Sequence, residues 1–129
     1  MENQSSTDLA ERTFLFATRI VKLCCTIQDH HKNLKALSNQ LMRSGTSIGA
    51  NIHEAKGAQS KADFIAKYHI CLKEARETHC WLRLLSATEC FPKDRLAPML
   101  TECEEITKMI VASLITIKKN QNSSKIISS

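Results

Sequence analysis

The sequence has few of the residues that make turns and strands. Its 129 residues include only 3 Gly and 2 Pro, and aromatic residues make up 5%. Gly and Pro mark turns, and aromatic residues favour strands, so both shortages argue against a β-rich fold. At this length one hydrophobic core is expected. We therefore predict a single all-helical domain spanning residues 1–129.

Signals for export or membrane insertion are also lacking. No apolar run approaches the roughly 18 residues of a membrane-spanning helix. The opening residues, MENQSSTDLAER, are polar and acidic, unlike a secretory signal. We therefore expect a cytoplasmic protein without a membrane partner, whose 6 cysteines are thiols and not a disulfide framework.

Patterns that bind metals or perform catalysis are missing as well. The sequence contains no C-x-x-C, no H-x-x-x-H and no Glu-x-x-His pair. Glu74 and Glu77 share a helix face, but we expect them to accept ion pairs from Arg43 or from a neighbouring subunit, in preference to acid–base chemistry. We predict no metal, no cofactor and no enzymatic activity.

Apolar residues spaced by three and four predict four helices, at about residues 8–29, 34–57, 61–89 and 94–118. The core positions expected on these helices include Ile20, Leu41, Cys71, Leu82 and Cys103. Asp8 with Glu11, and Ser60 with Asp63, fit capping patterns that open the first and third helices. Phe91-Pro92 ends the third helix. The polar, serine-rich tail at 120–129 is expected to fray.

Two glycines lie inside the second predicted helix. Gly45 and Gly49 are four residues apart and form a bare notch on one side of it. Each costs about 1 kcal/mol relative to alanine, which close approach of another helix backbone would offset. A locally weak or bent helix is the alternative.

Positive charge gathers in the middle of the chain. The formal net charge is +5, and residues 31–86 carry 9 Lys/Arg against 4 Asp/Glu. A basic line on the third helix (His69, Lys73, Arg76 and Arg83), with Lys56, Lys61 and Lys67 near the preceding turn, is our candidate nucleic-acid surface. The alternative is a solvated face, or one paired within a subunit interface.

The third helix is apolar on two sides, and both sides must be buried. Cys71 and Leu82 lie on its core side, while Ile70 and Leu84 lie on the far side. This pattern indicates self-association. The interface residues we expect are Arg43, Ser47, Ala50, Glu54, Ile70, Glu77, Trp81 and Leu84.

The stretch SGTSIGANIHEAKGAQSKADFIAKYHICLKEARETHCWLRLL, and more weakly LTECEEITKMIVASLITIKK, resembles a bacterial four-helix-bundle family. That family includes the 23S rRNA intervening-sequence proteins and is related to the accessory variability proteins of diversity-generating retroelements. The matching elements are Arg43, the segment from Ser47 to Ala55, Ser60-Lys61, Phe64 and the segment from Glu74 to Glu77. The chain departs from the pattern at Gly49, where the family often has proline, and at Ser44, where it often has a second arginine.

The resemblance implies an antiparallel up-down-up-down four-helix bundle that assembles into a homo-oligomeric ring, typically a pentamer. It also implies nucleic-acid binding, because the retroelement relatives suggest it. Our leading hypothesis is therefore a non-catalytic oligomer that binds RNA or DNA by charge and shape, without reading sequence. The alternative is a protein-interaction adaptor, for example an accessory partner of a reverse transcriptase.

Overall fold

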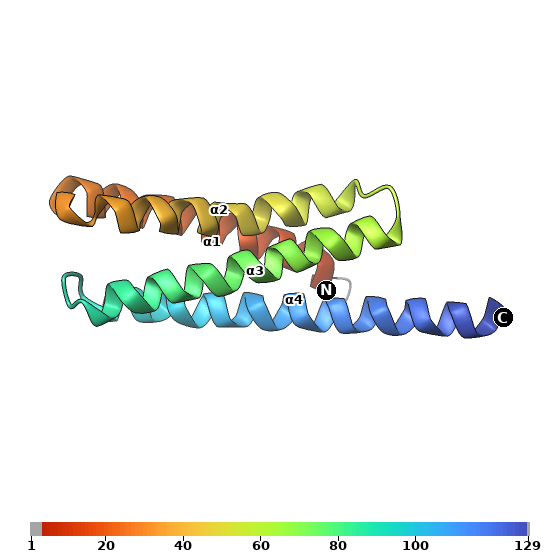
Figure 1. Cartoon of the computed structure of the whole chain (residues 1–129). Coiled ribbons are helices and arrows are strands. Elements are labelled where there is room, and N and C mark those ends of the chain that lie inside the picture. Colours follow the sequence, from red (N-terminus) through yellow and green to blue (C-terminus); the bar gives the residue numbers. More distant parts are fainter. Residues whose placement is uncertain (1–3, 129) are drawn as a thin grey trace.

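The structure is a computed structural model that describes the backbone of residues 4–128 and the side chains of residues 9–120. All regular structure in residues 4–128 is helical, which confirms the predicted class. The elements are α1 (Gln4–His30), the short 3-10 turn η1 (Lys32–Leu34), α2 (Lys35–Lys56), α3 (Lys61–Ala87) and α4 (Lys93–Ser128). Figure 1 shows the helices lying alongside one another, with the α2–α3 connection at one end and the α3–α4 connection at the other. Each helix packs on the next in the chain, and α4 also contacts α1.

The outer ends of the first and last helices differ from the prediction. Helix α1 begins at Gln4, so Asp8 lies inside it and does not open it. Helix α4 does not end near Lys118 but continues through Ser128, across the tail expected to fray. The physical reason is that neither Gly nor Pro occurs after Pro98, so the sequence holds no strong helix stop.

The core follows the apolar spacing read from the sequence. Ile20, Leu41, Cys71 and Leu82 are all fully buried, as predicted. Ile106 of α4, three residues after Cys103, is also fully buried and was missed. Burying a side chain of this size contributes about 1.5–3 kcal/mol. These residues form one continuous core cluster that holds the four long helices together.

The turn between α2 and α3 is set by a helix cap, as the sequence indicated. The Ser60 side chain accepts a hydrogen bond from the Asp63 N–H at 3.0 Å, and the Asp63 carboxylate accepts one from the Gln59 N–H at 3.3 Å. Both contacts satisfy N–H groups near the helix start. This cap fixes where α3 begins, and therefore which of its residues face solvent.

Three buried thiols join successive helices. Each donates a hydrogen bond to a backbone carbonyl of a neighbouring helix: Cys24 to Ser38 at 3.3 Å, Cys71 to Ile48 at 3.6 Å and Cys103 to Ala75 at 3.3 Å. Burial raises the pKa of Cys71 and of Cys103 to about 12, because the interior disfavours a thiolate. The three act as small core residues with a weak donor.

The glycine notch is a site of close approach between α1 and α2. A Cβ atom on Gly45 would lie 2.9 Å from the Ile20 side chain, and one on Gly49 would lie 3.3 Å from the backbone oxygen of Thr13. On the neighbouring side of α2, the buried hydroxyls of Ser44 and Thr78 lie 2.9 Å apart in a hydrogen bond to α3. Small residues thus let α2 lie close to both of its neighbours.

We predict that Gly49→Leu destabilises the protein, because its side chain meets the α1 backbone. Overpacking of this kind lowers the free energy of unfolding by about 1–3 kcal/mol. Gly57→Leu is the matched control, since a Cβ on Gly57 would be 3.8 Å from the nearest atom outside its chain neighbours. Equal chemical-denaturation midpoints for the two variants would contradict the close-approach interpretation.

Candidate nucleic-acid interface

The basic line lies on the solvent side of α3. His69, Lys73, Arg76 and Arg83 are all exposed. Among the described side chains, residues 9–120, no ion pair involves Lys73, Arg76 or Arg83. Within residues 9–120, these three cations are therefore exposed and belong to no ion pair.

The lysines near the α2–α3 connection differ in their availability. Lys56 and Lys61 are exposed. Together with Ile117 of α4, they line a groove of about 370 Å³. Lys67 instead contacts the Asp63 carboxylate at 3.3 Å, one helical turn earlier. Lys56 and Lys61 thus belong to no ion pair among the described side chains, whereas Lys67 is paired within its own helix.

Two acidic residues of α3, Glu74 and Glu77, share one cation of α2. An Arg43 guanidinium nitrogen lies 2.6 Å from Glu77, and another lies 3.4 Å from Glu74, which is 7% exposed. The hydrogen bond to Glu77 raises the pKa of Arg43 further. The sequence suggested either Arg43 or a neighbouring subunit as the partner of Glu74 and Glu77, and the structure pairs both with Arg43. Glu74 and Glu77 of α3 therefore pair with α2, while Lys73, Arg76 and Arg83 are exposed.

A groove lined by polar and charged residues, largely through their aliphatic parts, lies between α3 and α4. His79 Nε2 and a Glu104 carboxylate oxygen are 2.9 Å apart, and Arg76, Thr107 and Lys108 complete the lining. Within residues 9–120 no three His, Cys, Asp or Glu side chains are arranged to hold a metal ion. The groove extends the polar surface from the basic line toward α4.

The expected interface residues lie mainly on the surface shared by α2 and α3. Ser47 donates to the Arg43 carbonyl of its own helix at 2.7 Å, while Ala50 and Glu54 are exposed. Ile70 is 40% exposed and Leu84 is 48% exposed. The indole nitrogen of Trp81 is buried and has no hydrogen-bond partner within the described side chains. This surface combines open apolar side chains with an unsatisfied N–H group.

A second exposed apolar surface on α1 was missed by the sequence reading. Phe14 is 66% exposed and Leu15 is 51% exposed. Phe14 borders a groove of about 290 Å³ that also includes Gly49 and Ala50 of α2. The run Phe14-Leu15-Phe16 could have indicated this surface, because only Phe16 lies on the core side of the helix and the other two must point elsewhere.

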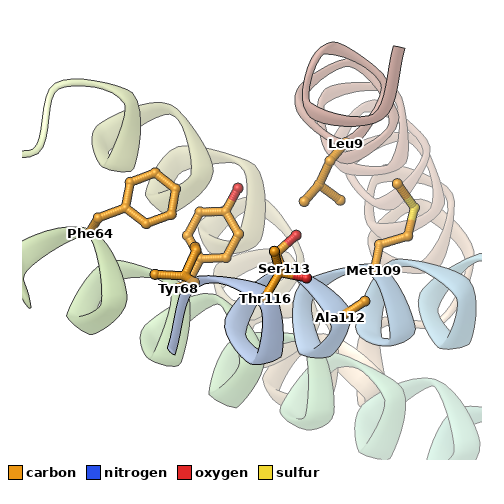
Figure 2. A pocket seen from close by; sticks show the side chains of 8 residues that line it. Leu9, Phe64, Tyr68, Met109, Ala112, Ser113 and Thr116 are labelled. Carbon is orange, nitrogen blue, oxygen red and sulfur yellow. The ribbon is translucent and has the colours of Figure 1, made fainter. Parts of the chain in front are cut away.

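An apolar hollow lies where α1, α3 and α4 meet. Figure 2 shows Leu9 of α1, Phe64 and Tyr68 of α3, and Met109 of α4 around it. Its volume is about 430 Å³, and the Phe64 and Tyr68 rings stack with centroids 4.6 Å apart. No Lys or Arg lines this hollow, so it does not contribute to a phosphate-binding surface.

The fold and this surface define a small helical protein with one strongly cationic helix face. Over residues 6–112 the chain matches the model of the 23S rRNA-intervening sequence protein family, and it belongs to that family. No curated protein matches it. No helix in the described residues is long and apolar enough to cross a membrane.

A crystal structure of a relative has the same fold. It is a protein of unknown function from the S23 ribosomal protein family of Bacteroides thetaiotaomicron VPI-5482. The two structures align with a TM-score of 0.79 and 42% sequence identity, covering 82% of this chain and 97% of the relative. The family relationship thus extends over nearly all of the relative, but not over all of this chain.

We predict that Arg43→Gln lowers the melting temperature, because it leaves the buried Glu74 carboxylate without its guanidinium. Adding Glu74→Gln should recover part of the loss, since a neutral amide is less costly to bury than an unpaired charge. Thermal unfolding followed by circular dichroism measures both. A further decrease in the double variant would mean that the pair does not stabilise α2 against α3.

Proposed function

We propose that this protein is a non-enzymatic, self-associating bundle that binds RNA or DNA through charge and shape. The observation that carries the proposal is the exposed basic line of α3, whose Lys73, Arg76 and Arg83 have no carboxylate partner within the described side chains. A solvated cation surface of this kind favours a polyanion, because binding releases condensed counterions.

The dimensions of the basic line suit a phosphate backbone. Lys73 and Arg83 are ten positions apart in one helix, so they are separated by roughly 15 Å along its axis. One strand of a duplex places about four phosphates over that length, because successive phosphates are about 3.4 Å apart along the duplex axis. Phe, Tyr and Trp make up only 5% of the residues, which gives little opportunity for base stacking. Binding is therefore expected to be insensitive to sequence.

Self-association belongs to the same proposal. We infer an antiparallel up-down-up-down bundle that forms a homo-oligomeric ring, most simply the pentamer implied by the family resemblance. Connections at alternate ends of the bundle support the helix order (Figure 1). A ring needs two different complementary patches on each subunit. The two patches would be the surface with Ile70, Trp81 and Leu84 and the surface with Phe14 and Leu15, because both expose apolar side chains.

Assembly would strengthen weak phosphate contacts. Each subunit has a formal charge of +5, and a ring repeats the basic line once per subunit. Repeated contacts on one nucleic acid act at a high effective concentration, so avidity exceeds the affinity of one line. A cytoplasmic location, where RNA and DNA are present, is part of this proposal.

An adaptor role is the second candidate, and the exposed Phe14 and Leu15 favour it. An apolar patch of this kind also fits a protein partner, such as a reverse transcriptase or another nucleic-acid enzyme. Charge reversal of Lys73, Arg76 and Arg83 distinguishes the two candidates. It should remove nucleic-acid binding, but it should leave an apolar protein contact unchanged.

We predict that Lys73→Glu, Arg76→Glu and Arg83→Glu together abolish nucleic-acid binding while the assembly keeps its mass. The measurements are fluorescence anisotropy with labelled duplex DNA and single-stranded RNA, and light scattering. Lys22→Glu, Lys32→Glu and Lys35→Glu form the control, because these exposed lysines give the same charge change away from the basic line. Loss of assembly mass in the first variant would place its residues in the subunit interface.

Trp81 provides a direct readout of assembly, because it is the only tryptophan in the chain. If its surface joins subunits, dilution should shift its emission to longer wavelength as the indole becomes hydrated, in parallel with a falling mass. Leu84→Lys should give the shifted emission at every concentration. A monomeric mass at all concentrations, with constant emission, would contradict self-association.

A further inference from the structure

Helix α4 extends beyond the rest of the bundle. It is 36 residues long, compared with 27 for α3 and 22 for α2. Figure 1 shows its C-terminal end projecting past the α2–α3 connection. The part after Ile117, residues 118–128, is here called the projecting segment. At 1.5 Å per residue it adds roughly 16 Å of helix.

The charge of this region has one sign. From Ile106 to Ser129 the sequence contains no Asp or Glu, while Lys118, Lys119 and Lys125 all fall within the projecting segment. Lys118 and Lys119 are exposed. The opposite end of the bundle is mixed, because Asp29, Glu89 and Asp94 accompany its basic residues.

The projecting segment starts beside cations that the fold has already gathered. Ile117, the residue immediately before it, lines the same groove as Lys56 and Lys61 of the α2–α3 connection. Two connected elements therefore bring lysines to one end of the bundle, and α4 continues that surface outward.

This feature lies outside the region shared with the family. The family match ends at residue 112, and the crystal structure of the relative is almost fully covered by 82% of this chain. Ile115, at the base of the projection, is 61% exposed. The projecting segment carries three lysines and no carboxylate, and like charges on one helix repel one another. A bound polyanion would remove that repulsion.

We propose that the projecting segment, together with Lys56 and Lys61, is a second phosphate-binding surface that lengthens the contact of this protein with a nucleic acid. The proposal rests on the proposed function, and it adds a contact particular to this chain. The occupant is the sugar–phosphate backbone, because the surface offers lysines and little aromatic surface for a base. The segment from Lys118 to Ser128 contains no Phe, Tyr or Trp. Phe64, which lines the groove with Lys56 and Lys61, is already stacked on Tyr68.

The test compares three full-length proteins: wild type, the variant Lys118→Glu/Lys119→Glu/Lys125→Glu, and the control Lys22→Glu/Lys32→Glu/Lys35→Glu. Lys32 and Lys35 lie at the α1–α2 connection, at the end of the bundle away from the projection (Figure 1). Binding of a labelled duplex is titrated at several salt concentrations, and light scattering verifies that the mass is unchanged. Vesicles of phosphatidylcholine with phosphatidylserine are titrated in parallel.

We expect the projecting-segment variant to bind the duplex about tenfold or more weakly than the control at low salt. The slope of the logarithm of its binding constant against the logarithm of salt concentration should become shallower by about 1 for each lysine that contacts a phosphate.

Equal binding by the two variants would overturn this inference and leave the proposal for the basic line of α3 intact. No binding by wild type at low salt would overturn the proposed function itself. Vesicle binding that depends on the projecting segment, without duplex binding, would identify lipid phosphate as the occupant and overturn the assignment to nucleic acid.

Discussion

The structure depends on how closely α2 can approach its two neighbours. A Cβ atom on Gly45 or Gly49 would press closely against α1, and the Ser44 hydroxyl accepts a hydrogen bond from Thr78 of α3. Tight contacts of this kind fix the helices lengthwise as well as sideways, because a shift would drive other side chains into the same space. The register that results sets Arg43 of α2 opposite the acidic residues of α3.

That register determines the electrostatic character of the surface. Arg43 holds Glu74 and Glu77 toward α2 and offsets part of their charge, and neither carboxylate forms an ion pair with Lys73, Arg76 or Arg83 within the described side chains. The same helix thus separates its charges, with the acids toward the bundle and the bases toward solvent. A chain with a modest formal charge of +5 acquires one concentrated cationic face in this way. The core contact and the proposed nucleic-acid surface are consequences of one arrangement.

Sequence reasoning predicted those features that depend on local periodicity. The spacing of Ile20, Leu41, Cys71 and Leu82 identified core positions, and Ser60 with Asp63 marked the start of α3. Sequence reasoning did not decide which cation pairs with Glu74 and Glu77, because an arginine of the same chain and one of a neighbouring subunit are both compatible with their spacing. The predicted end of α4, near residue 118, was wrong, because a polar, serine-rich tail without Gly or Pro carries no clear signal for or against a helix. Contacts between distant segments, such as Ile117 beside Lys61, needed the structure.

The central claim is that this surface recognises phosphate charge without reading bases. Its most direct test is the affinity of the wild-type protein for several unrelated duplexes of equal length, measured between about 50 and 200 mM salt. The account predicts nearly equal affinities and a steep linear fall of the logarithm of the binding constant with the logarithm of salt concentration. Failure to bind at low salt, or a strong preference for one sequence with a shallow salt dependence, would contradict it.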